Sequence, residues 1–446
     1  MSKPQEQEML VGCEECGLVV ELPVLVDDEK ATCPRCDHTL AKQIALPFQR
    51  PLSYGVACLV MLVASISFPF MSFSVKGISQ SITLMHAAEM LNVFQNSLLA
   101  ILLLLTVLVL PAFYISSLLY LYYRAGRVIT GKTAKKISSP EKRLCRLMLG
   151  VEPWLMVDVF LIGVLVSLVK IASLADIGIG MSFWAFCIYT MLVVKCVSMV
   201  DRTWLWLQFI PLQPIPGVQA GDCHNSHNHI NCHTCSQLNP IEYADDKHAR
   251  CIRCHGRLHA YHPGQMLQRS WALLIAAIVF FVPANLYPMM YTVSLGKSEG
   301  STILEGVTLL WHLKSYPIAI VIFLASVVIP LAKMLALAWL YYHAQKDVFD
   351  EEKKAIKKLK IYRITELIGR WSMIDIFVVS ILVALVQLKN LMAIYPGPAA
   401  LSFACVVLLT MLSAMVFDPR VFWPKEPLSE SSSGNGNNYK EDQSYE

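Results

Sequence analysis

The sequence predicts an all-α integral membrane protein with eight transmembrane helices, arranged as two parallel repeats of four. Three observations support this prediction. Of the 446 residues, 55% are apolar and only 16% are charged, whereas about a quarter of the residues in a soluble chain carry a charge. The apolar residues gather in runs close to the length of about 20 that a helix needs to cross a bilayer. A four-cysteine cluster occurs twice, each time ahead of a block of such runs.

Each cysteine cluster has the spacing of a metal site. Two CxxC knuckles can hold one zinc ion tetrahedrally, with each sulfur about 2.3 Å from the metal. We therefore expect a small cytosolic zinc ribbon ahead of each repeat. A closed set of four thiolates leaves no open position, so the expected role is structural, and a rubredoxin-like iron centre is the less favoured alternative. The expected ligands are Cys13, Cys16, Cys33 and Cys36 in the first ribbon and Cys232, Cys235, Cys251 and Cys254 in the second.

The apolar runs give eight expected spans. Several contain proline, which a transmembrane helix tolerates where neighbouring groups satisfy the freed carbonyls. The expected spans are 52–71, 98–123, 153–174, 180–200, 271–290, 316–342, 372–390 and 398–416.

The charges between the spans predict the orientation of the chain. The segments 124–150 and 343–371 each carry eight Lys or Arg residues, whereas the loops on the other side carry few. Basic loops stay on the cytoplasmic side of a membrane. Both termini and both cysteine clusters are therefore expected in the cytosol, and no secretory signal peptide opens the sequence.

The two blocks of spans match each other along the chain. P-W-L-M-V-D-V-F at 153–160 corresponds to R-W-S-M-I-D-I-F at 370–377, and other matches keep an offset of 217 to 220 residues. Four helices are an even number, so the two copies share one orientation and the repeat is parallel. We also expect short extracytoplasmic strands within 71–85 and 290–304.

The repeat divides the chain into five expected parts. We expect the ribbons to dock against each other or against the basic loops, which would hold the two halves in register. The parts are a zinc ribbon (1–46), a four-helix repeat (47–205), a linker with the second ribbon (206–264), the second four-helix repeat (265–423) and a disordered tail (424–446).

Ionisable side chains inside the spans are the candidates for function, because a charge at membrane depth is costly. Lys333 lies inside the sixth span and Asp375 near the cytosolic end of the seventh. Ser326 and Ser372 share a helix face with them at spacings of seven and three residues. We expect a polar patch with Lys333 and Asp375 as ion partners; the alternative is a buried pair that only fixes helix register. In the first half Asp158 matches Asp375 and is a secondary candidate.

The first half differs from the second at the other patch positions. Tyr114 stands where Lys333 would be, and Val107 where Ser326 would be. The second half is therefore expected to carry the specialised site. Arg202 and Arg420, just past the last helix of each half, are expected to anchor helix ends at the lipid phosphates.

Several motifs are absent from the sequence. There is no Walker A motif, no GxSxG and no HExxH, so nothing indicates an ATPase or a hydrolase, and we do not expect an enzyme. The basic loops are interpreted as topology signals, and no nucleic-acid partner is expected.

These motifs together resemble the paraquat-inducible protein A family. The resemblance rests on the paired zinc ribbons, the duplicated four-helix blocks, W-S-M-I-D-I-F after Gly369-Arg370, Y-P-M after P-A-N-L, and S-A-M-V-F-D-P-R near the end. It covers the chain from Cys13 to about Arg420. It implies a protein of the Gram-negative inner membrane whose partner is a periplasmic MCE-domain tunnel protein.

The resemblance also implies a function. The chain would be the inner-membrane subunit of an MCE-type envelope-spanning lipid transport system, which passes phospholipid between the inner membrane and the tunnel. The polar patch carried over to that role is Ser326, Lys333, Ser372 and Asp375. Two alternatives remain: an exporter of toxic small molecules or a sensor of metal or oxidant stress, and a membrane-bound redox protein with iron in the cysteine clusters.

Overall fold

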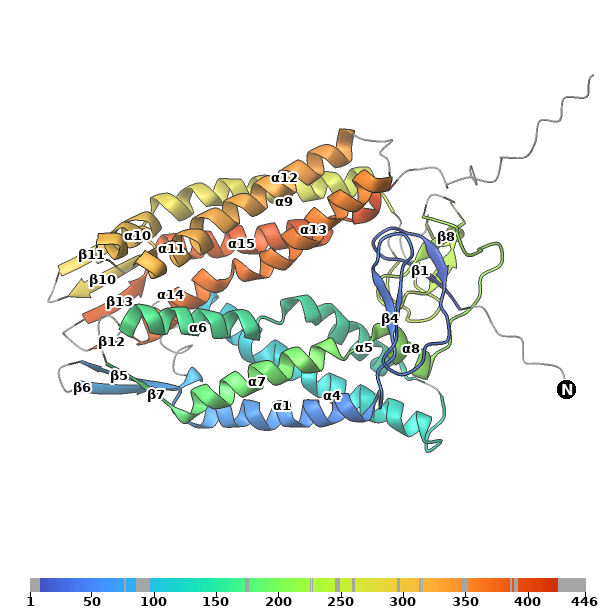
Figure 1. Cartoon of the computed structure of the whole chain (residues 1–446), viewed down its shortest axis with the longest axis horizontal. Helices are drawn as coiled ribbons and strands as arrows, with labels where there is room; N and C mark the ends of the chain where they lie inside the picture. Colours follow the sequence, from blue (N-terminus) through green and yellow to red (C-terminus); the bar gives the residue numbers. More distant parts are fainter. Residues whose placement is uncertain are drawn as a thin grey trace, which may run out of the picture.

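Two helical bundles lie side by side, one from each half of the chain, and both cysteine clusters lie at the same end of them (Figure 1). Small sheets lie at the opposite end. The structure is a computed structural model of the chain. It describes residues 9–75, 78–85, 97–135, 137–172, 176–224, 226, 228–244, 249–258, 261–294, 297–312, 314, 316–346, 352–385, 387–388 and 392–423.

The helices follow the predicted apolar runs, with additional helices in the two basic segments. The first half contains α1 (Gln49–Ser67), α3 (Ser97–Leu104), η1 (Leu105–Val109), α4 (Leu110–Ile129), α5 (Ser139–Val151), η2 (Glu152–Trp154), α6 (Val157–Ala172), α7 (Met181–Ser198) and α8 (Arg202–Phe209). The second half contains α9 (Pro263–Leu286), α10 (Ile303–His312), α11 (Tyr316–Phe323), η4 (Leu324–Val328), α12 (Ile329–Lys346), α13 (Glu352–Trp371), α14 (Ile374–Leu385), α15 (Pro398–Val416) and η5 (Pro419–Phe422). A short helix η3 (Ile241–Ala244) lies between the halves in the chain.

Within the described ranges, seven helices are long and apolar enough to cross a membrane. The expected span 372–390 contains α14, which has only 12 residues. At 1.5 Å per residue this helix is about 18 Å long, shorter than the hydrocarbon core of about 30 Å. A break after Trp371 separates it from α13, which is too polar to extend the apolar run.

The fold is mostly helical and not all-α, because five small sheets accompany the helices within the described residues. Two-stranded sheets form in the cysteine-rich modules from β1 (Leu10–Gly12) with β2 (Val19–Glu21), β3 (Lys30–Thr32) with β4 (Thr39–Lys42), and β8 (His229–Asn231) with β9 (Leu238–Pro240). The far end carries a sheet of β5 (Met71–Val75), β6 (Ile78–Ile82) and β7 (Asp176–Ile179), and one of β10 (Met290–Ser294), β11 (Lys297–Ser301), β12 (Gln387–Leu388) and β13 (Met392–Pro396).

The strands expected within 71–85 and 290–304 are confirmed, and each pair forms an antiparallel hairpin. The strands β7 and β13, which add to these hairpins, were not predicted. Each of these strands lies more than 90 residues after the hairpin with which it pairs. A local sequence pattern cannot predict such a distant partner. Gly180 and Gly397 permit the approach, because a Cβ at either residue would lie 2.0 Å from a backbone carbonyl oxygen.

A π-helical turn precedes the corresponding proline of each half. In η1 and η4 the backbone N–H at the end of the turn bonds five residues back, from Leu110 to Leu105 and from Ile329 to Leu324. Pro111 and Pro330 follow directly and have no N–H to donate. The wider turn accommodates the proline ring without breaking the helix, and such turns often mark functional positions.

The halves contact each other through α6 and α14. The rings of Phe160 and Phe377 meet edge to face with their centroids 5.4 Å apart. Ser167 Oγ donates to the carbonyl of Val378, and a Cβ at Gly163 would lie 3.0 Å from the Cβ of Phe377. Phe160 and Phe377 are separated by the predicted repeat offset, so residues that match in sequence touch each other, as at a two-fold axis.

Two predictions remain untested by the fold. The five-part division of the chain stays a prediction, and the tail expected to be disordered lies outside the described residues.

We predict that Phe377→Ala weakens the contact between the halves. A buried Phe→Ala change costs roughly 3 to 5 kcal/mol in soluble cores, and we expect the lower end because lipid is as apolar as the core. The midpoint of thermal unfolding in detergent should fall. Trp184→Ala is the control, since Trp184 is 59% exposed. Equal midpoints for the two variants would contradict this packing.

Candidate functional site

The cysteines of each cluster converge on one point. All four sulfurs lie within 4.8 Å of one another in both clusters, and all eight side chains are buried. The sulfurs of Cys13 and Cys36 are 3.5 Å apart, and those of Cys232 and Cys254 are 3.6 Å apart. A tetrahedron with metal–sulfur bonds of 2.3 Å has edges of about 3.8 Å, whereas a disulfide bond is about 2.0 Å long. Each cluster can therefore hold a tetrahedral metal ion.

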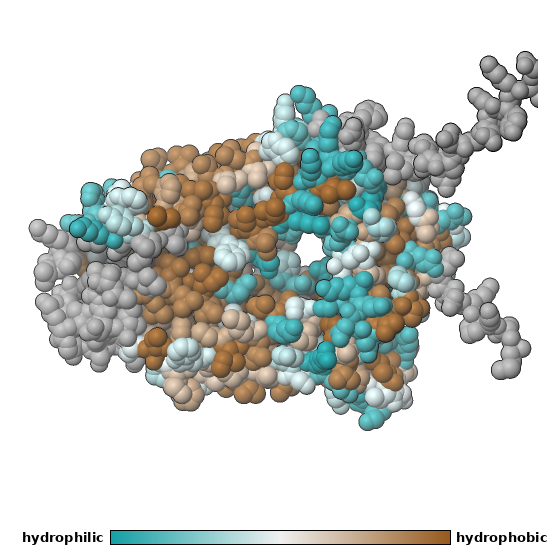
Figure 2. All heavy atoms as spheres, viewed as in Figure 1, coloured by the Kyte–Doolittle hydropathy of each residue, from teal (hydrophilic) through white to brown (hydrophobic). Residues whose placement is uncertain are grey.

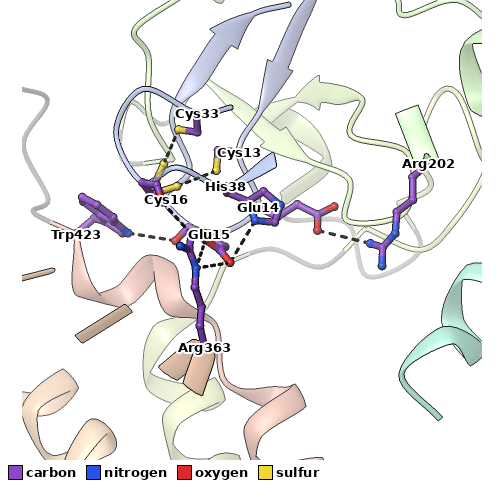
Figure 3. A network of polar contacts seen from close by, with 10 residues as sticks. Cys13, Glu14, Glu15, Cys16, Cys33, His38, Arg202, Arg363 and Trp423 are labelled. Atoms are coloured by element: carbon purple, nitrogen blue, oxygen red, sulfur yellow. Dashed lines mark hydrogen bonds and ion pairs between the residues drawn. The ribbon is translucent and has the colours of Figure 1, made fainter. Parts of the chain in front are cut away.

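The first cysteine module, residues 9–46, docks on the second half of the chain. Arg363 of α13 bonds the carboxylate of Glu15, with Nε 3.2 Å from Oε1, and its Nη2 donates to the carbonyl of Cys36 at 2.8 Å (Figure 3). Trp423 donates to the carbonyl of Glu15, and the guanidinium of Arg35 lies 4.3 Å above the Trp423 ring. The module that precedes the first half is thus held by the second.

The environment of Glu15 keeps it ionised. Burial disfavours the charged form, but hydrogen bonds from His38 and Arg363 outweigh burial and lower the pKa of this carboxyl below its ordinary value. Glu15 therefore presents a full negative charge to α13.

The second cysteine module, residues 229–258, docks on the first half in the same manner. Arg146 of α5 donates from Nη1 to the carbonyl of Cys254 at 2.9 Å, and Lys142 donates to the carbonyl of Arg253 at 3.3 Å. Cys145 and Met148 pack with the second cysteine cluster in one apolar core. The docking is crossed: each module is continuous with one half and also bonds the other. Each module contacts its own half as well, through Thr203, which donates to the carbonyl of Leu40 at 3.0 Å, and through Arg420, whose Nη2 lies 3.2 Å from Nε2 of His233.

The crossed contacts use matching residues. Arg146 and Arg363 are 217 residues apart and each bonds the carbonyl of the last cysteine of a cluster, Cys254 or Cys36. The modules also touch each other, since Asn231 donates to the carbonyl of Gly12 at 2.8 Å. Docking against both the basic segments and the other module is confirmed.

A cavity of about 530 Å³ separates the two halves next to the modules. Figure 2 shows an opening at this level, where the apolar surface of the helices meets the hydrophilic surface of the module end. Valines of α7 and methionines of α15 supply apolar lining. The charged lining residues are Glu152, Asp158 and Arg202 of the first half and Lys333, Arg363, Glu366 and Arg370 of the second.

Lys333 is the most deeply buried charge of the lining. Its side chain is 3% exposed, and its Nζ has no hydrogen-bond partner within the part of the chain that the structure describes. A Cβ at Gly369 would lie 2.9 Å from this amine, so the glycine leaves the space that the amine occupies. An amine so placed is available to a ligand in the cavity.

The other predicted patch residues are also buried. Ser326 lies in η4, and Ser372 donates to the carbonyl of Gly369 at 2.7 Å, beside the Lys333 amine. Asp375 lies in the first turn of α14. Among the described residues the Lys333 amine has no hydrogen-bond partner, and its expected pairing with Asp375 stays a prediction. The structure brings Lys333 and Asp158 to the same cavity.

The expected lipid-anchoring role of the two terminal arginines is wrong for Arg420. Its side chain is 7% exposed, and its Nε lies 2.9 Å from Oδ2 of Asp418. Burial disfavours ionisation of Asp418, but Arg420 outweighs it and lowers the pKa of that carboxyl. Arg202 lines the cavity and lies 3.7 Å from both Glu14 and Glu152.

Sequence reasoning missed most of the charged lining. Arg363, Glu366 and Arg370 lie in the segment 343–371, which was interpreted as a topology signal, and Glu152 lies just outside the segment 124–150. Their position could have identified them, because each residue lies within about one or two helical turns before the repeated W-x-M-x-D-x-F motif.

Comparison with known proteins assigns the family. Residues 48–210 and 267–426 match the family described as Paraquat-inducible protein A. The chain is 40% identical over 424 residues to "Intermembrane transport protein PqiA" of Escherichia coli (strain K12), which covers 94% of this chain and 96% of that protein.

More distant relatives are similar over nearly the same length. A "Probable intermembrane transport protein" of Haemophilus influenzae is 26% identical over 93% of this chain and 95% of its own. "Lipophilic envelope-spanning tunnel protein A" of Escherichia coli (strain K12) is 25% identical over 92% of this chain and 90% of its own. No solved structure gave a significant match. The chain is a multi-pass membrane protein and belongs to the paraquat-inducible protein A family.

Proposed function

We propose that the chain is the inner-membrane subunit of an envelope-spanning lipid transport system and passes phospholipid to or from a periplasmic MCE-domain tunnel protein. The names of its relatives, which refer to intermembrane transport and to an envelope-spanning tunnel, support a transport role. The observation that carries the proposal is the cavity between the halves, which combines apolar walls with a buried amine.

The cavity suits a molecule with an apolar body and an anionic head. Apolar side chains of α7 and α15 would contact acyl chains, and the amine of Lys333 would bind a phosphate oxygen. Ser326, Ser372 and Asp375 would position the helices around that amine, and Asp158 would face it from the first half. No nucleotide-binding motif occurs in the sequence, so loading would follow from an ion gradient, from the partner, or from passive exchange.

We place both termini and both cysteine modules in the cytosol. The modules contact α5 and α13, the helices of the two basic segments, and such segments remain on the cytoplasmic side. We also propose that the halves are parallel repeats of four crossings, with α14 as the short seventh crossing. The two family matches and the contact of Phe160 with Phe377 support this arrangement.

Zinc is the proposed metal of both cysteine clusters. Eight buried thiols at tetrahedral distances fit zinc, and the metal would stabilise modules too small to build an adequate apolar core.

We predict two zinc ions per chain. Elemental analysis of the purified protein should give about two zinc and little iron. Cys235→Ser should lower zinc to about one ion per chain, since three thiolates leave an incomplete site. Cys405→Ser is the control, because Cys405 lies in α15 outside the clusters. Iron with visible colour would instead favour the redox interpretation.

We predict that Lys333→Met reduces the phospholipid that copurifies with the chain. Loss of a charge-assisted hydrogen bond should weaken binding about tenfold or more. Mass spectrometry of lipids from gently solubilised protein measures this. Lys195→Met is the control, since Lys195 lies in α7 and is exposed. Equal lipid in both variants would remove Lys333 from the proposed site.

The partner requires a separate test. A pull-down of the full-length chain should recover a protein with MCE domains. Recovery of lipid without such a partner would support a lipid site but contradict the proposed transport system.

A further inference from the structure

Each cysteine module connects the two halves across the end of the cavity. The first module continues into α1 of the first half and is bonded by Arg363 of the second half. The second module leads into α9 of the second half and is bonded by Arg146 of the first half. The two modules therefore act as two straps between the same two halves. The first runs from the first half to the second, and the second runs from the second half to the first.

The first strap crosses the rim of the cavity. Glu14 and Glu15 are adjacent in the first CxxC knuckle. Glu14 pairs with Arg202 at 3.7 Å, and Glu15 pairs with Arg363 (Figure 3). Arg202 comes from the first half and Arg363 from the second, and both line the cavity. One rigid knuckle thus holds two opposite walls.

The apolar contacts follow the same crossed pattern. The first cysteine cluster shares a core with Tyr362, Phe422 and Trp423 of the second half. The second cluster shares a core with Met148 and Leu149 of the first half. Each module is therefore attached to the opposite half by buried apolar contacts as well as by hydrogen bonds. Each strap is thus fixed to both halves.

We propose that the two crossed modules are redundant straps that keep the two halves from moving apart at the module end of the cavity, and that this end widens only when both modules release their opposite half. Two straps with separate attachment points, Arg363 for the first and Arg146 for the second, hold the halves together even when one attachment is lost. Away from the modules, the halves meet where α14 packs against α6 and α3, and this contact would serve as the hinge line. This inference concerns access to the cavity and does not depend on which molecule the cavity carries.

The test compares single and double release of the straps. The variants are Arg146→Gln, Arg363→Gln and the two combined. The reporter is Ala414→Cys, because Ala414 lines the cavity and is 4% exposed. Its reaction rate with a water-soluble maleimide is measured on full-length protein in detergent, with the chain that lacks the reporter as background.

We expect small increases from the single variants and a roughly tenfold increase from the double variant, since a buried thiol reacts in proportion to the open fraction. Arg146 is not among the lining residues, so its added effect cannot come from a change in the cavity wall. A double variant that reacts no faster than Arg363→Gln alone overturns the proposal.

Two matched controls exclude general loosening. Arg143→Gln with Lys360→Gln removes the same charge from the same two helices at exposed positions, and should leave the rate unchanged. A reporter at the exposed lining residue Ser198, Ser198→Cys, should react at the same rate in every background. An equal increase at both reporters, or in the control pair, also overturns the proposal.

Discussion

The fold depends on the crossed attachment of the two cysteine modules. Strands of three or four residues cannot build a stable core by themselves, so a metal ion bound by the four thiols would be what makes each module rigid. Rigidity would matter because Arg146 and Arg363 bind backbone carbonyls of the last cysteines, and a carbonyl beside a bound metal would be a fixed acceptor. The two helical bundles thus take their relative position from two small modules outside the membrane-spanning helices.

This attachment explains why a cavity exists between the bundles. The halves meet at two levels, through Phe160 and Phe377 in the helices and through the modules at one end. Between these levels the helices need not fill the space. The cavity in turn makes the burial of Lys333 tolerable, because an ammonium group sealed in apolar packing would carry the full cost of desolvation, whereas one facing a charged cavity does not.

Sequence patterns predicted those features of the protein that are determined by residues close together in the chain. Cysteine spacing predicted both clusters, and apolar runs predicted the long helices. The short α14 was predicted as a full span, because hydropathy records composition and not where a helix ends. Strand β13 was not predicted, because it pairs with β10, which lies in a hairpin about 100 residues earlier in the chain. Arg146 and Arg363 were counted as topology signals, and nothing in their neighbourhood reveals that each binds a module from the opposite half.

The asymmetry of the halves follows from their geometry. Tyr114 occupies the position that matches Lys333, and Glu152 the position that matches Gly369. In the second half the glycine leaves room for an amine that reaches the cavity; in the first half a buried ring takes the amine's place and a carboxylate lines the wall. Two facing copies of one scaffold need only one amine to serve a shared cavity, and a second would repel it. The first-half wall carries two carboxyl groups and one guanidinium, and the second-half wall carries three basic groups and one carboxyl. The two walls therefore attract each other on balance, and a ligand with an anionic head would compete for the more basic wall.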